Sequence, residues 1–290
     1  MDRWLGVPVC VVMTVARRLV SWLRAAPRSP VKRIVFLKLA EQGSTVLACP
    51  AIRRAVEMVG RDNVYFLVFE ENRFILDVID LIDRDNVLSI PTEGLASTIR
   101  GALKAIRRMR RLLIDTTIDL EFFARSTAAL CFLSGASRRV GFHAFGGEGP
   151  YRGNLMTHRL IFNPHLHTAQ TFRMMVEALN VPPQRLPTFD LVPGPADDPA
   201  PPFQPEAEEV EHVRALLGQA ADTEDTRPLV LLNANASDLM PLRRWPPGRY
   251  VELARRLLKR YPALRVAMTG APEEQRVAAG LVDQVDSKRC

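Results

Sequence analysis

The chain has 290 residues, of which 47% are hydrophobic and 24% are charged, and these fractions are ordinary for a soluble globular protein. Its formal net charge of +7 and its pI of about 9.6 favour an anionic partner, such as a nucleic acid, a phosphate-bearing small molecule or an acidic membrane surface. The four cysteines are far apart, so they predict neither a zinc site nor a disulfide framework, and they fit a reducing, cytosolic compartment.

The N-terminal segment WLGVPVCVVMTVA is apolar, but it is shorter than the roughly 18 residues that span a bilayer. Two interpretations remain open: an interfacial helix on a membrane surface, or a helix that packs on the protein's own core. In the first interpretation, Trp4 and Trp22 would lie at the level of the lipid headgroups. The helix is predicted from apolar residues at three- and four-residue steps: Leu5, Val9, Val12, Ala16, Leu19 and Leu23.

Strand-like and helix-like segments then alternate along the chain. Strands are predicted at about 31–39, 63–69, 86–90, 116–123 and 138–142, and helices at about 45–59, 72–79, 95–113 and 124–136. Such alternation predicts a parallel sheet with helices on both faces.

The predicted helix at 95–113 is strongly basic. Its six cations could follow a phosphate backbone, but they lack interleaved aromatic residues and any nucleic-acid motif. The periodicity favours a solvated outer face, with four apolar residues turned inward: Leu103, Ile106, Met109 and Leu113. We therefore expect no nucleic-acid partner.

The segment from 143 to 168 is predicted to be irregular, and it contains four of the five histidines. The spacing HLH lacks a cysteine or an acidic third ligand nearby, so no metal site is predicted. A helix at about 169–179 follows.

Nine of the 22 prolines lie between residues 182 and 205, which predicts an extended connection. A helix at about 206–219 leads into a second unit. There, RPLVLLNANAS and LRVAMTG read as strands, and PPGRYVELARRLLKRYP reads as a helix. We expect another open α/β sheet that binds ligands at the carboxyl ends of its strands.

Five segments occur in order along the chain: LKLAEQGSTVLACPAIR, RSTAALCFLSGASRRVGF, NPHLHTAQTFRMMVEAL, NANASDLMPLRRWPPGRYVELARRLL and TGAPEE. Together they resemble glycosyltransferase family 9, the heptosyltransferase-like enzymes of lipopolysaccharide assembly, over about residues 32–281. The resemblance implies an α/β fold of GT-B type with two Rossmann-like domains, the second of them incomplete. It also implies transfer of a sugar, with inversion, from a nucleotide-diphospho-sugar to an acceptor.

The resemblance divides the chain into four parts. Residues 1–30 are an amphipathic N-terminal helix and linker, and 31–181 are the N-terminal, acceptor-side Rossmann-like domain. Residues 182–205 are a Pro-rich linker, and 206–290 are a partial C-terminal domain that binds the nucleotide-sugar. Family members continue through further βα units, including an acidic-Gly-x-x-His loop for the diphosphate. Nothing similar follows Glu274, so we expect a chain truncated at its C-terminus.

The turn after the first strand is the predicted catalytic region. Gly43 would let the backbone turn tightly, and the family resemblance implies an aspartate base at the next position. That position is Ser44 here, which either takes part in catalysis or caps a helix that starts at Thr45. Glu41, three residues before Ser44, could supply the carboxylate instead.

Donor binding is predicted in the second unit. Asn235 and Ser237 would bind phosphate, and Arg243, or its neighbour Arg244, would face the departing diphosphate. The other residues predicted for the donor are Gly43, Thr269, Gly270 and Glu274; those predicted for the acceptor are Arg125, His143 and His165.

The implied function is an inverting glycosyltransferase that moves a heptose-like sugar to a lipopolysaccharide or related cell-envelope acceptor. It would be cytoplasmic and peripheral on the inner membrane, in contact with an anionic membrane surface, and without a cofactor or a metal. One alternative is a catalytically impaired, truncated homologue that only binds acceptor or nucleotide-sugar. A dinucleotide-binding oxidoreductase is disfavoured because EQGS lacks the G-x-G-x-x-G pattern.

Overall fold

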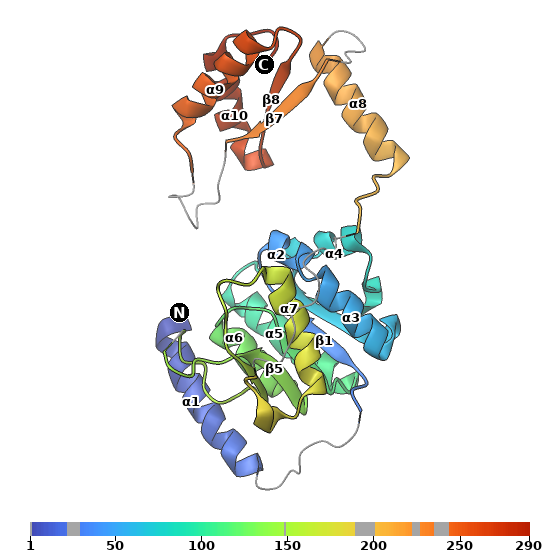
Figure 1. The fold of residues 1–290 in the computed structure, drawn as a ribbon, viewed down its shortest axis with the longest axis vertical. Helices are drawn as coiled ribbons and strands as arrows, with labels where there is room; N and C mark the ends of the chain where they lie inside the picture. The colour runs from blue at the N-terminus through green and yellow to red at the C-terminus, as the bar shows by residue number, and fades with distance from the viewer. Residues whose placement is uncertain (1, 22–29, 148, 189–200, 222–226, 235–243) are drawn as a thin grey trace. The chain divides into compact units, whose positions relative to one another are not determined.

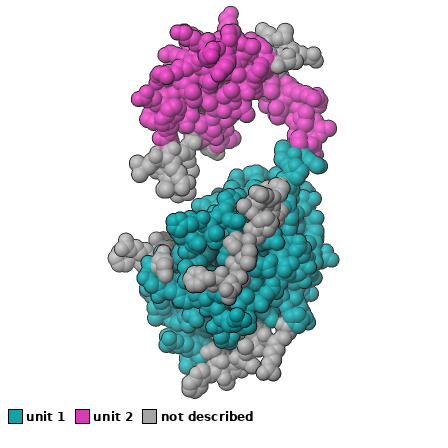
Figure 2. All heavy atoms as spheres, viewed as in Figure 1, with its two compact units in different colours: residues 1–204 teal, residues 205–290 magenta. Residues whose placement is uncertain are grey.

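A computed structural model of the chain describes residues 2–21, 30–147, 149–188, 201–221, 227–234 and 244–290. The chain divides into two compact units, Met1–Gln204 and Pro205–Cys290 (Figure 2). Each unit has its own parallel sheet, so each is described by itself (Figure 1).

The first unit is built on a six-stranded sheet in which all neighbouring strands are parallel. The strand order is β3-β2-β1-β4-β5-β6, so the chain starts at the middle and winds outward to both edges. The strands are β1 (Ile34–Leu37), β2 (Val64–Phe69), β3 (Val87–Ile90), β4 (Thr116–Asp119), β5 (Arg138–Phe142) and β6 (His158–Leu160).

Helices cover both faces of this sheet, which confirms the predicted layers. Within β1, Ile34 and Phe36 belong to one core cluster, and Val35 and Leu37 belong to the other. Strands buried on both faces read as continuous apolar runs, and this is why IVFL is unbroken. The first face is covered by α3 (Cys49–Val59), α4 (Phe74–Ile79) and α7 (Thr168–Glu177), and the second by α1 (Asp2–Ser21), α5 (Leu95–Arg111) and α6 (Arg125–Leu133).

The prediction of an irregular segment at 143–168 is wrong at one place. β6 lies inside this segment and pairs with β5 at the edge of the sheet. The strand has only three residues, so it is too short for a side-chain alternation to reveal it.

The predicted inward face of α5 is also partly wrong. Leu103 and Leu113 are exposed, whereas Ile106 and Met109 are buried. Gly101 brings another side of α5 close to the end of β3, since a Cβ there would lie 2.5 Å from the ring of Pro91, the residue after β3. Because α5 makes its close contact through Gly101, the helix is rotated so that Leu103 faces solvent.

The N-terminal helix α1 packs on the first unit's own core. Cys10 is fully buried, and Thr14 Oγ1 accepts a hydrogen bond of 2.9 Å from the backbone N–H of Asn154. On the opposite side of the helix, Val12 and Leu19 are 68% and 70% exposed. The apolar stripe noted in the sequence is therefore on the solvent side.

The second unit contains a two-stranded parallel sheet. Its core is formed mainly by α9 (Pro247–Arg260), α10 (Gln275–Val285) and the two strands, and it includes the buried Ala254 and Leu281. Pro247 is the first residue of α9, where its missing N–H costs no helical hydrogen bond. The elements are α8 (Ala207–Ala221), β7 (Leu229–Asn233), α9 (Pro247–Arg260), β8 (Arg265–Thr269) and α10 (Gln275–Val285). None of the helices in the described part of the chain is long and apolar enough to cross a bilayer.

Candidate functional site

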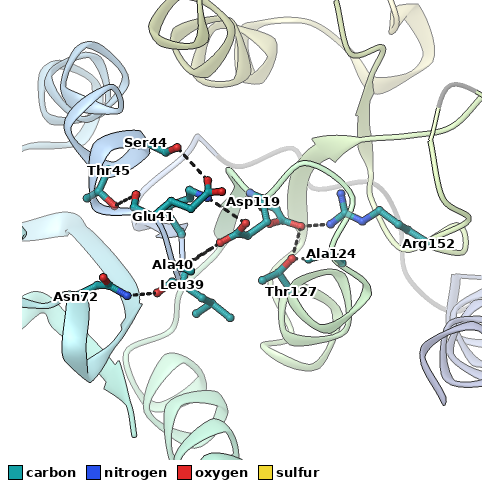
Figure 3. A network of polar contacts seen from close by, with 12 residues as sticks. Leu39, Ala40, Glu41, Ser44, Thr45, Asn72, Asp119, Ala124, Thr127 and Arg152 are labelled. Atoms are coloured by element: carbon teal, nitrogen blue, oxygen red, sulfur yellow. Dashed lines mark hydrogen bonds and ion pairs between the residues drawn. The ribbon is translucent and has the colours of Figure 1, made fainter. Parts of the chain in front are cut away.

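The candidate site lies where β1 and β4 end, at the carboxyl edge of the first unit's sheet. These strands are parallel neighbours, and Leu37 pairs with Asp119 at the end of the register. The segments that follow them, 38–44 and 120–125, are joined by hydrogen bonds (Figure 3). Open α/β sheets bind their ligands at this edge.

A buried ammonium group links the two segments. The Lys38 side chain is fully buried, and its Nζ lies 2.9 Å from Glu41 Oε2 and 3.1 Å from Glu121 Oε2. A buried cation is stable only when it is paired, and here two carboxylates pair with it. Glu121 Oε1 also accepts hydrogen bonds from the backbone N–H groups of Leu39 (2.9 Å) and Ala40 (3.4 Å), which ties the turn after β1 to the end of β4.

Glu41 carries the carboxylate that solvent reaches most easily. Its side chain is 65% exposed, compared with 17% for Glu121. Its Oε2 accepts a hydrogen bond of 3.1 Å from Ser44 Oγ in addition to the contact with Lys38 (Figure 3). The backbone of Glu41 is left-handed, with φ at 68°, a conformation that is costly for a residue with a side chain and is common at functional sites.

The structure corrects two details of the predicted turn. Gly43 does not make the tight turn, because it lies inside α2 (Gln42–Val46) and only Glu41 in this turn is left-handed. Ser44 does not cap a helix that starts at Thr45, because α2 has already begun before it. The Ser44 hydroxyl binds the Glu41 carboxylate instead.

Asp119 is a second carboxylate at this edge, but it is fully buried. It pairs with Arg152 and accepts a hydrogen bond of 3.0 Å from Thr127 Oγ1 (Figure 3). Burial raises the pKa of the Asp119 carboxyl above its ordinary value, while Arg152 and Thr127 act in the opposite direction. The ion pair with Arg152 lets Asp119 anchor the loop that carries this arginine. Solvent does not reach the Asp119 carboxylate, so it is not placed to meet a substrate.

The residues predicted to contact an acceptor follow the neighbouring strands. Arg125 begins α6 after β4, and its Nε donates a hydrogen bond of 2.8 Å to the carbonyl of Tyr151. His143 directly follows β5, and His165 is exposed between β6 and α7. The strand order β1-β4-β5-β6 places these segments along one edge, starting from Glu41. Among the residues that the structure describes, no group of three or more His, Cys, Asp or Glu could hold a metal ion.

The donor-side residues belong to the second unit. Thr269 ends β8 and Gly270 follows it, at the carboxyl edge of that sheet. Glu274 Oε2 accepts a hydrogen bond of 2.8 Å from the backbone N–H of Ala271, so its carboxylate caps the start of the short 3-10 helix Pro272–Glu274. Three further residues predicted for the donor lie outside the described residues: Asn235, Ser237 and Arg243.

Sequence reasoning missed Lys38 and Glu121. Lys38 is the only charged residue in the apolar run IVFLKLA, and a charge in a buried strand needs a partner, which was a usable signal. The pairing itself could not be predicted from spacing, because the two residues are 83 positions apart.

Several solved glycosyltransferases have a similar structure. A family 9 glycosyl transferase from Veillonella parvula matches with a TM-score of 0.63 and 19% identity, over 90% of this chain and 69% of that one. Escherichia coli ADP-heptose LPS heptosyltransferase II gives a TM-score of 0.62 and 17% identity, over 89% and 70% of the two chains. E. coli heptosyltransferase WaaC with ADP-2-deoxy-2-fluoro heptose gives a TM-score of 0.54 and 16% identity, over 87% of this chain and 73% of that one.

No protein-family model matches the chain, and a search of the curated proteins gives no match. At these low identities the structural likeness concerns the fold. The predicted α/β fold class of GT-B type is confirmed, and so is the resemblance to glycosyltransferase family 9 at the level of structure.

Proposed function

We propose that this chain is an inverting glycosyltransferase that moves a heptose-like sugar from a nucleotide-diphospho-sugar to a lipopolysaccharide or related cell-envelope acceptor. The observation that carries the proposal is the exposed Glu41 carboxylate, held by Lys38 and Ser44 at the carboxyl edge of a fold shared with solved glycosyltransferases. The similarity to two E. coli heptosyltransferases, one of them with an ADP-heptose analogue, supports the donor class. Within the same proposal, the enzyme works peripherally at the cytoplasmic surface of the inner membrane.

Glu41 is the general base in this proposal. In an inverting transfer the acceptor oxygen bonds to the anomeric carbon as the bond to the diphosphate breaks, and the acceptor hydroxyl loses its proton. The Glu41 carboxylate takes that proton. Lys38 and Ser44 both donate to Oε2, so they hold the carboxylate in place without supplying a competing acceptor. The base would thus have moved from the position of Ser44 to a residue that Ser44 contacts.

Removing the base tests this assignment directly. We expect Glu41→Gln to lower turnover by about 10²–10⁴-fold, the usual contribution of general-base catalysis, and to leave donor binding intact. Glu57→Gln is the matched control, because Glu57 is also exposed and also paired with a cation. The measurement is nucleoside diphosphate release from ADP-heptose with a lipopolysaccharide acceptor. Wild-type turnover of Glu41→Gln would exclude Glu41 as the base.

Ser44 variants separate a lost base from a supporting hydrogen bond. Ser44→Ala should lower turnover by roughly 10- to 100-fold, because a hydrogen bond to a charged group contributes about 1.5–3 kcal/mol. Ser44→Asp should be neutral or harmful, because it sets a second negative charge beside Glu41. A clear gain of turnover in Ser44→Asp would instead identify Ser44 as the lost base position.

The donor side is tested by nucleotide binding. We propose that Arg243 contacts the diphosphate, so Arg243→Ala should weaken nucleoside diphosphate binding by about 1.5–3 kcal/mol. Arg256→Ala, an exposed arginine of α9, is the control. Calorimetry that gives equal affinities for Arg243→Ala and wild type would discard the assignment. Binding of ADP-heptose by the wild type without any turnover would favour the second candidate function, a homologue that only binds.

A further inference from the structure

We infer that the exposed faces of α1 and α5 together form a docking surface for an anionic lipid bilayer, here called the α1–α5 surface. The inference deepens the proposed location of the enzyme at a membrane, which belongs to the proposed function. It does not require the transferase activity, so the two can fail separately.

The apolar face of α1 is held outward by specific contacts. Arg17 donates a hydrogen bond to the carbonyl of Asn154, and Thr14 accepts one from the Asn154 N–H, so the rotation of the helix about its axis is fixed. The side turned away from these contacts is apolar: Val12, Val15 and Leu19 are 68%, 52% and 70% exposed. Solvent-exposed helix faces are normally polar, so an exposed apolar face indicates a binding surface.

The exposed face of α5 combines apolar residues with cations. Leu95, Ile99 and Leu103 follow one another at four-residue steps, and each is at least 45% exposed. Lys104, Arg107 and Arg111 are exposed beside them on the same helix. Apolar residues with basic residues along their margin are the composition of helices that lie at a membrane interface.

The two helices belong to one layer of the first unit (Figure 1). Both α1 and α5 contact α6, which packs against β4 and β5. Cys10 of α1 and Met109 of α5 are also members of the same core cluster, on one face of the sheet. The α1–α5 surface therefore consists of the exposed sides of two helices that flank α6 in the same helical layer.

The positive charge of the chain is concentrated on these two helices. α1 has three arginines and one aspartate, and α5 has six basic residues and no acidic one, so together they carry a formal charge of +8. The whole chain carries +7, so the remainder is close to neutral. This charge is complementary to an anionic surface.

An anionic bilayer fits this combination better than other partners. A second copy of the same surface would set the exposed cations Lys104, Arg107 and Arg111 against like charges, which is unfavourable. A nucleic acid would use the cations but would leave the apolar residues of α1 in water. Only a surface with anionic headgroups above an apolar interior uses both, because cations are attracted to the headgroups and aliphatic side chains leave water below them.

The test is co-sedimentation of the full chain with vesicles of phosphatidylcholine alone or of phosphatidylcholine mixed with the anionic lipid phosphatidylglycerol. We expect binding to the anionic vesicles only, and weaker binding at high salt. The triple change Lys104→Gln, Arg107→Gln, Arg111→Gln should lower the binding constant on the order of 100-fold, since each cation contributes roughly fivefold near an anionic surface. The triple change Val12→Gln, Val15→Gln, Leu19→Gln should lower it by about tenfold or more.

Matched controls distinguish binding through the α1–α5 surface from binding through the overall positive charge or through any exposed apolar side chain. Arg256→Gln, Lys259→Gln, Arg260→Gln removes the same charge from exposed positions of α9, and Phe74→Gln, Val78→Gln removes exposed apolar side chains of α4. Both controls should bind as the wild type does. Substitution is preferred to deletion of α1, because deletion would uncover the buried Cys10 and its core cluster.

Three results would overturn the inference. One is equal binding to both kinds of vesicle, and another is unchanged binding of both triple variants of the α1–α5 surface. The third is a concentration-dependent dimer, seen by light scattering, that the α1 variant abolishes while vesicle binding is absent. That result would assign the surface to a second copy of the chain.

Discussion

His158 is the side chain whose burial has the clearest consequence for pH dependence. It lies on β6 and is 4% exposed. Burial, together with the nearby charges of Arg138 and Arg139, lowers the pKa of His158 from 6.5 to about 4. All three causes act against the protonated ring. The folded state therefore excludes a proton that the unfolded chain binds.

This shift predicts an acid-labile contribution to stability. Because the folded pKa of His158 is depressed, its contribution is fully present above pH 6.5 and is lost as the pH falls from about 6.5 to about 4. The total is about 3 kcal/mol at 1.36 kcal/mol per pKa unit. Denaturant unfolding at pH 7 and pH 4.5 should show a smaller loss of unfolding free energy in His158→Gln than in wild type. The comparison at pH 7 isolates the packing cost of the substitution. Equal losses in both proteins would contradict the prediction.

At the same scale, sequence distance decides which contacts of the site could be anticipated. Glu41 and Ser44 are three residues apart, so spacing alone places them on one turn. Lys38 and Glu121 meet only because β1 and β4 are neighbours in the sheet, which the alternation of strands and helices does not specify. The exposure that separates Glu41 from the buried Asp119 also depends on the packed structure.

At the scale of elements, the contact between α1 and the loop before β6 depends on one glycine. Gly153 has φ at +67°, and a Cβ there would lie 2.5 Å from Thr14 Oγ1 and 2.7 Å from the carbonyl oxygen of Cys10. A side chain at this position would strain the backbone and push α1 away from the core.

We therefore expect Gly153→Ala to lower the free energy of unfolding by about 1–3 kcal/mol and to expose Cys10 to thiol reagents. Gly248→Ala is the matched control, because a Cβ at Gly248 has no neighbour within 4 Å and φ there is ordinary. Thermal melts report stability, and mass mapping of alkylated cysteines reports the position of α1. If Cys10 stays protected and the melting temperature is unchanged, Gly153 does not control this contact.

Elements that were mispredicted share a physical cause. β6 is a three-residue edge strand, and its pairing with β5 fixes it more than its own residues do. The inner face of α5 is set by Gly101 against Pro91, a close approach that apolar periodicity does not encode. For α1, which the sequence left between two interpretations, polar contacts with Asn154 set the orientation.

At the scale of the whole molecule, the cores of the two units are made of separate residues. Within the described residues, the core clusters of the first unit draw on 10–186 and that of the second on 234–285. Separate cores predict two unfolding transitions. Leu281→Ala in the second core and Ile118→Ala in the first should each cost about 2–5 kcal/mol and shift only the transition of its own unit.

Hydrogen exchange measured peptide by peptide at increasing denaturant concentration tests whether the two units unfold separately. Peptides of α10 should respond to Leu281→Ala, and peptides of β1 and β4 to Ile118→Ala. Loss of protection across both units from either substitution would show that the chain unfolds as one cooperative body.

The sequence by itself determined the fold class, the resemblance to glycosyltransferase family 9, and the placement of Glu41 and Ser44 on one turn. These follow from local information: the period of apolar residues, the position of prolines, motif order and short spacing. Only the tertiary structure decided that Lys38 bridges Glu41 and Glu121, and that the apolar side of α1 faces solvent. Both depend on which distant segments pack together, and that choice is made by the register of parallel strands and the fit of helices on the sheet.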